Sequence, residues 1–120
     1  MTTPLGTDTV HYTWRIEAGE RERLQIPIFG ADGTTPQDVT DYTVDAKIRT
    51  EQGGEVLYTF PAEHIEITDN VIELRIPGPT SAAWTWTVGW WRVVITAPEP
   101  DPTDPDSSRV VQGAFIVDPD

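Results

Sequence analysis

Residues 64–76 have the sequence HIEITDNVIELRI, and this stretch decides the fold class. Apolar and polar residues alternate on both sides of Asp69-Asn70, which is the period-2 pattern of a half-buried strand. Asp and Asn both tolerate a positive φ, so the pair predicts a two-residue hairpin turn of type I′. Closing the chain there makes two apolar cross-strand pairs, Ile67 with Ile72 and Ile65 with Leu74. A shift of one residue would destroy this segregation, so the register is well specified.

The same alternation recurs along the chain, and no 3.6-residue periodicity competes with it. Strands are predicted near residues 12–16, 24–28, 42–48, 56–60, 65–68, 71–76, 90–97 and 109–117. Loops rich in Gly, Pro and Asp separate them, and residues 77–83 (PGPTSAA) fit one helical turn. Pro27 lacks a backbone donor, so its strand is expected at a sheet edge or at a bulge. Gly89 is expected to mark a bend or bulge.

These elements predict a single antiparallel, immunoglobulin-like β-sandwich of about seven or eight strands. The term describes architecture only, because the Cys…Trp…Cys pattern of antibody domains is missing. The sandwich is expected over residues 11–120, after a flexible polar arm of residues 1–10. Residues 98–106 carry four prolines and four acids, which predicts an extended, solvated loop.

Composition excludes several classes of function. Twenty acidic and eight basic residues give a net charge of −12, which repels nucleic acids and anionic lipid. There is no cysteine, hence no disulfide, thiolate zinc site or cysteine nucleophile. No stretch is apolar for 18 residues, and the first residues lack the charged and apolar regions of a secretion signal. We expect neither a nucleic-acid partner nor a membrane partner.

Catalysis and metal binding are poorly supported. Only His11 and His64 could act as bases at neutral pH, and each lies at the polar edge of a predicted strand. No serine sits in a Gly-x-Ser-x-Gly turn. Asp101, Asp104 and Asp106 offer oxygen ligands, but their spacing matches no EF-hand loop and the prolines between them stiffen the chain. We therefore predict no catalytic residues, no metal and no cofactor.

The tryptophans are the candidates for binding. Residues 84–91 (WTWTVGWW) contain four of the five tryptophans. On the strand at 90–97, the odd positions are all apolar and predict a core face that includes Trp91. If this strand pairs with the last one, several outward side chains can form an apolar patch, which usually marks a protein contact. The interface candidates are Trp84, Trp86, Trp90, Val94, Val110 and Ile116.

The order of short motifs resembles a known family. The motifs are IEAG (16–19), LxIxI (24–28), ADGTTPQDVT (31–40), AKIR (46–49), TSAA (80–83), GxWxV (89–93) and GxFxV (113–117). Together they resemble the small β-sandwich domains of tailed-phage virion proteins, such as the N-terminal domain of baseplate upper proteins. They look most like the stand-alone versions in phages of high-GC Gram-positive hosts. The chain departs from the family at Trp91, where Tyr is usual, and in the acidic loop 98–106.

The resemblance implies a non-enzymatic structural or adaptor protein of the virion, made in the host cytoplasm and assembled in many copies with other virion proteins. The tail or its tip is the expected location. Two alternatives stay open, namely capsid decoration or a head–tail junction, and a carbohydrate-binding module for host recognition through the exposed tryptophans.

Overall fold

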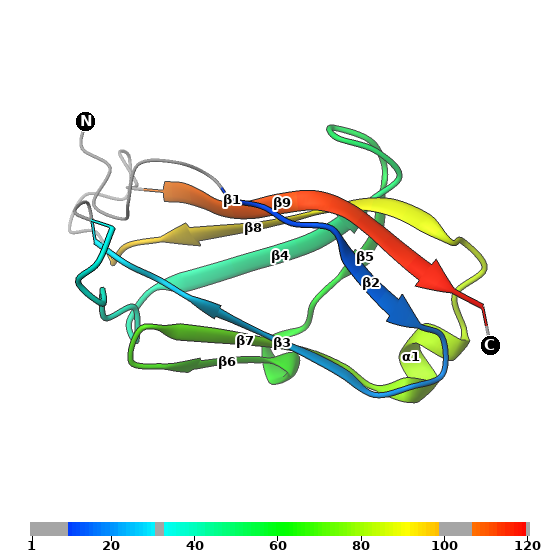
Figure 1. The fold of residues 1–120 in the computed structure, drawn as a ribbon, viewed down its shortest axis with the longest axis horizontal. Coiled ribbons are helices and arrows are strands. Elements are labelled where there is room, and N and C mark those ends of the chain that lie inside the picture. Colours follow the sequence, from blue (N-terminus) through cyan, green and yellow to red (C-terminus); the bar gives the residue numbers. More distant parts are fainter. Residues whose placement is uncertain (1–9, 31–32, 99–106, 120) are drawn as a thin grey trace.

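The computed structural model describes residues 10–30, 33–98 and 107–119. Two β-sheets pack face to face, which confirms the predicted all-β sandwich (Figure 1). The larger sheet contains β1 (Val10–His11), β2 (Trp14–Glu17), β4 (Thr43–Arg49), β5 (Val56–Thr59), β8 (Val88–Thr96) and β9 (Ser107–Asp118). The smaller sheet contains β3 (Glu22–Pro27), β6 (Ile65–Thr68) and β7 (Val71–Ile76).

The strand order is β1-β9-β8-β4-β5 in the larger sheet, with β2 also on β9, and β3-β7-β6 in the smaller sheet. The named pairings are antiparallel except those of β1 and β2, which run parallel to β9. This places the first described strand beside the last one in the same sheet. Residues 1–9 of the expected N-terminal arm lie outside the described residues, and Val10 already pairs with Val111 in β1.

The hairpin at residues 65–76 has the predicted register, with Ile67 opposite Ile72 and Ile65 opposite Leu74. The predicted turn type is wrong, because Asp69 has a φ of 54° and Asn70 has no positive φ. Asn70 is held by a neighbouring segment instead. Its carbonyl accepts a hydrogen bond from the Ile28 amide at 2.7 Å, and its Nδ2 donates to the Ile28 carbonyl at 3.2 Å. The contact with the end of β3 therefore fixes the backbone of Asn70.

The edge position of Pro27 is confirmed, since β3 lies at one edge of the smaller sheet. The expected helical turn is also present, as α1 (Gly78–Ala82). Ser81 in α1 is fully buried, and its Oγ accepts a hydrogen bond from the Gly19 amide at 3.0 Å. A Cβ on Gly78 would lie 2.5 Å from the Gly19 carbonyl oxygen. Close packing therefore ties α1 to the link between β2 and β3.

The core fills the space between the sheets and is built around two indole rings. Trp91 is fully buried, as predicted, and meets Trp14 edge to face with ring centroids 5.1 Å apart. The Trp91 Nε1 donates to the Tyr12 carbonyl at 2.9 Å, so its one polar atom is satisfied. Gly113 lies opposite Trp91, and a Cβ there would collide with the same Tyr12 carbonyl. A glycine at this position lets the N-terminal segment cross β9 closely.

Gly89 does not mark the bulge that we expected. It is buried within β8, and the register of β8 and β9 shifts between Val93 and Val94 instead. A Cβ on Gly89 would lie 2.8 Å from the Arg49 carbonyl, so packing against β4 explains the glycine. The remaining short helix is η1 (Ala62–His64), before β6. Among the residues that the structure describes, no helix is long and apolar enough to cross a membrane.

Candidate protein interface

The six interface candidates fall into separate places. Trp84 and Trp86, between α1 and β8, are half-buried and stacked on each other with centroids 4.6 Å apart. Both rings contact the buried Phe115, at 6.0 Å and 5.9 Å, and Trp84 also meets Tyr58 edge to face. These two tryptophans close the end of the sandwich near α1. Their main contacts are with the core.

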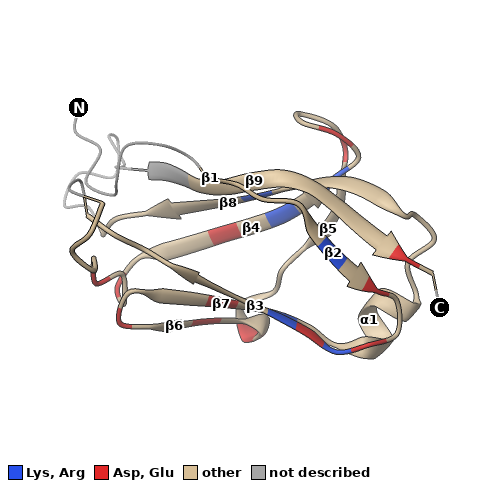
Figure 2. Cartoon of the chain, in the orientation of Figure 1, with Lys and Arg blue, Asp and Glu red and all other residues tan. Residues whose placement is uncertain are grey.

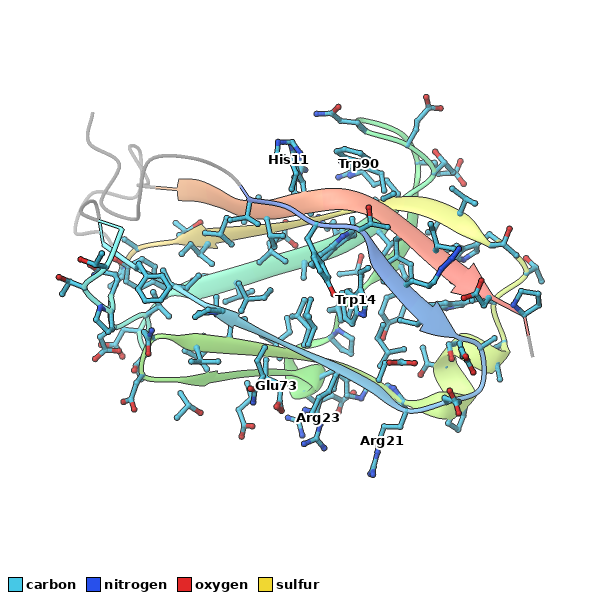
Figure 3. The ribbon with its side chains drawn as sticks, in the orientation of Figure 1. His11, Trp14, Arg21, Arg23, Glu73 and Trp90 are labelled. Atoms are coloured by element: carbon cyan, nitrogen blue, oxygen red, sulfur yellow. The ribbon has the colours of Figure 1, made fainter. Side chains whose placement is uncertain are left out.

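Trp90, Val94 and Ile116 are half-buried and alternate with the core residues of β8 and β9. The alternation places them on the outer face of the larger sheet, the face that points away from β3, β6 and β7. Figure 3 shows Trp90 projecting from this face on the same side as His11, whereas Trp14 points between the sheets. Val110 differs from them, because it packs against the core cluster.

The structure does not join these residues into one apolar patch. The strand register lines up a polar row across the outer face, with His11 opposite Gln112, Gln112 opposite Arg92 and Arg92 opposite Lys47. This row separates Trp90 and Ile116 from Val94. The same period-2 rule that turns Trp90 outward also turns Arg92 and Gln112 outward, so the patch is mixed rather than apolar.

The outer face carries a group of cations around Trp90, which we call the cationic block. Its members are Lys47, Arg49 and Arg92, and both β4 members lie directly across from β8: Arg49 opposite Trp90 and Lys47 opposite Arg92. Lys47 has an ion pair with Asp45 at 3.5 Å, and the Arg49 Nη1 donates to the Gly54 carbonyl at 2.8 Å. Arg92 has no ion pair or hydrogen bond with a side chain among the described residues.

Two polar atoms of this face are buried without a hydrogen-bond partner among the described residues, namely Trp90 Nε1 and Gln112 Oε1. A buried polar atom without a partner is unfavourable in the isolated domain. One atom is a donor and the other an acceptor, and each can gain a partner from outside only when its side chain moves, because neither atom is accessible at the surface. Tryptophan and arginine are also the residues that most often dominate the binding energy of protein interfaces.

The groups that we considered for chemistry lie apart. His11 is exposed in β1. His64 is the last residue of η1, directly before β6 in the sequence, and its Nδ1 is buried without a partner in the described part of the chain. The described residues contain no group of three His, Asp or Glu side chains placed to hold a metal. Asp101, Asp104 and Asp106 of the acidic loop lie outside the described residues.

In the part of the chain that the structure describes, Asp38 and Tyr58 have a shifted pKa, and neither belongs to the outer face. The side-chain and backbone hydrogen bonds from Thr40 lower the pKa of the exposed Asp38, which is an ordinary loop contact. Burial, with a smaller contribution from the Glu63 charge, raises the pKa of Tyr58 above its usual value of 10.0. Tyr58 meets Phe60 and Trp84 edge to face, so its shift reflects packing at the core boundary.

The cationic block was not predicted from the sequence. Lys47 and Arg49 have the polar parity of their strand, and Arg92 has that of β8, but these patterns do not reveal that β4 and β8 are neighbours. That pairing joins residues more than forty positions apart. In comparisons with known proteins, no family model matches the chain, and no curated protein matches it.

Proposed function

We propose that this domain is a non-enzymatic structural adaptor of a tailed-phage virion, located at the tail or its tip. The observation that carries the proposal is the outer face of the larger sheet. A half-buried indole with an unpartnered N–H lies there among cationic side chains. This combination is typical of a protein-docking surface. The resemblance of the motif order to phage β-sandwich domains supports the virion as the setting.

The positions of the tryptophans favour an adaptor over a carbohydrate-binding module. A sugar-binding platform needs exposed rings beside amide or acidic groups. Trp84 and Trp86 are engaged with each other and with Phe115, so their faces are largely occupied. Trp90 lies beside Arg49 and Ala114 across the sheet, and no carboxylate occupies either paired position.

The proposal is tested on purified particles of the phage that encodes the chain. Mass spectrometry of the particles is expected to detect the protein, and a specific antibody is expected to label the tail or its tip in electron micrographs. Label over the head would move the function to capsid decoration or the head–tail junction. If mass spectrometry finds no copy of the protein in intact particles, the adaptor proposal fails.

A second comparison separates docking from glycan binding. The Trp90→Ala variant, supplied in place of the natural protein during infection, is expected to enter particles less efficiently. Trp84→Phe is the matched control, since it keeps an aromatic ring against Phe115 and leaves the outer face unchanged. Normal incorporation of Trp90→Ala together with lost binding to host cell-wall glycans would instead support the carbohydrate-binding module.

A further inference from the structure

Charge is unevenly distributed over this domain. The chain has a net charge of −12, yet the centre of the outer face holds the cationic block Lys47, Arg49 and Arg92 around Trp90. Between residues 50 and 74 the sequence contains six acids and no Lys or Arg. The block is therefore a positive region, partly offset by the Asp45 carboxylate beside Lys47, on a strongly acidic protein.

Part of the acidic segment forms the free edge of the smaller sheet. β6 is the terminal strand in the order β3-β7-β6, so one side of it has no strand partner among the described residues. Three exposed acids lie along this edge, Glu63 in η1, Glu66 in β6 and Asp69 in the turn after it. We call Glu63, Glu66 and Asp69 the acidic edge. Charged residues commonly protect such an edge from uncontrolled pairing.

The acidic edge and the cationic block belong to opposite sheets. Figure 2 shows the blue segments of β4 and β8 in the upper sheet, and β6 at the lower side of the molecule with acidic residues only. The block lies on the face of the upper sheet that points away from β6. The two surfaces of one molecule therefore point in different directions and cannot reach each other within that molecule.

This geometry restricts how two copies can meet. A two-fold symmetric contact through the outer face would oppose the cationic blocks of both copies, and like charges in an interface are unfavourable. A head-to-tail contact instead opposes the block of one copy and the acidic edge of the next. Such contacts repeat from copy to copy and produce rings or filaments.

We propose that the outer face around Trp90 docks the acidic edge of a second copy of this chain, in a head-to-tail arrangement. The inference rests on the proposed adaptor function, because it identifies the molecule that binds the outer face. Opposite charges supply the selectivity, and the carboxylates offer acceptors to Arg92. Each single contact is weak in solution, because exposed ion pairs contribute little. Closure of a ring would strengthen it by adding contacts.

The test is sedimentation of the purified chain at concentrations up to about 1 mM. The buffer contains 0.15 M salt, because the Debye length of about 8 Å at this ionic strength screens the long-range repulsion between acidic copies. The wild type is expected to form species larger than a dimer as its concentration rises. Arg92→Glu is expected to weaken association about tenfold or more, because it places a carboxylate opposite the acidic edge. Arg23→Glu is the matched control, since it makes the same charge change at an exposed position in β3 on the other sheet.

A charge swap tests the direction of the contact. Glu66→Arg alone is also expected to weaken association, whereas an equal mixture of Arg92→Glu and Glu66→Arg is expected to restore it. In the mixture, the altered face of one variant meets the altered edge of the other, and the natural face meets the natural edge. A two-fold contact through the outer face would leave association of the Glu66→Arg variant alone unimpaired. Where circular dichroism shows that a variant does not fold, Arg92→Gln or Glu66→Gln replaces it in the single-variant comparison, and the mixture is not interpreted.

Three outcomes would overturn the inference: a wild type that stays monomeric at every concentration, an Arg23→Glu variant as impaired as Arg92→Glu, or a mixture that stays monomeric. These experiments use the purified chain alone, so they are independent of the particle analysis. If the protein is present in particles but monomeric in solution, the adaptor function stands and its neighbour is another virion protein. If it self-associates but is absent from particles, the virion setting fails and the contact stands.

Discussion

Trp90 and Trp91 are neighbours in the sequence and differ in almost every other respect. Trp91 is fully buried between the sheets, packs against Trp14 and donates its N–H to the Tyr12 carbonyl. Trp90 lies half-buried on the outer face of the same strand, with an N–H that has no partner among the described residues. A cluster of tryptophans along one strand is therefore not a single feature. Strand parity divides it into a satisfied core residue and an unsatisfied surface residue.

The two tryptophans are expected to differ most in what their single replacement does to the free energy of unfolding. Trp91→Ala is expected to destabilise the fold by about 3–5 kcal/mol, because it leaves a large cavity in the core and removes the donor to Tyr12. Trp90→Ala is expected to change the stability by less than about 1 kcal/mol, since it removes a half-exposed ring. Denaturant unfolding of both variants measures the difference. Equal losses of stability would mean that Trp90 supports the fold as much as Trp91 does.

A smaller change in stability is expected for the two residues of β9 that lie opposite the two tryptophans of β8. Gly113 lies opposite Trp91, and Ala114 lies opposite Trp90. Gly113→Ala is expected to cost about 1–3 kcal/mol, because the new Cβ collides with the Tyr12 carbonyl that the Trp91 N–H needs. Ala114→Ser is the control on the outer face and is expected to stay within about 0.5 kcal/mol of the wild type. A neutral Gly113→Ala would show that the N-terminal segment moves away from β9 easily.

The hairpin and the faces of the strands could be predicted because they depend on local order. The alternation of apolar and polar residues from Ile65 to Ile76 specifies the register of that hairpin. The alternation along β8 likewise identifies Trp91 as a core residue. The arrangement of distant strands could not be predicted in the same way. The parallel pairing of β2 with β9 joins Trp14 to Phe115, and no local pattern marks that contact. The cationic block depends on such a pairing, which is why the sequence showed its residues without showing their proximity.

The same contrast between satisfied and unsatisfied groups applies to two buried polar side chains. Ser81 is fully buried, accepts from the Gly19 amide at 3.0 Å and donates to the Gly78 carbonyl at 3.3 Å. Gln112 is 7% exposed on the outer face, and its Oε1 has no partner among the described residues. Ser81→Ala is expected to cost about 1–2 kcal/mol, because it leaves the Gly19 amide without its acceptor.

Gln112→Leu is expected to leave the free energy of unfolding within about 0.5 kcal/mol or to raise it, because it removes an unsatisfied oxygen. Thermal unfolding followed by circular dichroism compares the two variants under identical conditions. A large loss of stability for Gln112→Leu would reveal that the Gln112 oxygen is satisfied in solution, for example by an ordered water. The outer face would then need no partner to complete its hydrogen bonds at this position.

The smallest expected effect concerns pH and the boundary of the core. Burial and the Glu63 charge raise the pKa of Tyr58 above its usual value of 10.0, so the folded state favours the neutral phenol. Between the pKa of the unfolded chain and that of the folded protein, the folded state holds the proton more tightly. The contribution of Tyr58 to stability is therefore constant below about pH 10 and falls as the pH rises above it.

Tyr58→Phe is expected to remove this alkaline loss of stability. In a pH titration of the folded protein, it is also expected to remove the phase of the tyrosinate absorbance change that occurs at the highest pH. Glu63→Gln is expected to shift that phase to a lower pH without removing it, because burial is the larger cause. If Glu63→Gln instead moves the phase as far as pH 10, the ring is solvated and its edge contact with Trp84 opens in solution. The stacked Trp84 and Trp86 would then be more accessible than their contacts with Phe115 indicate. The end of the sandwich near α1 would then be a second candidate binding surface, beside the outer face.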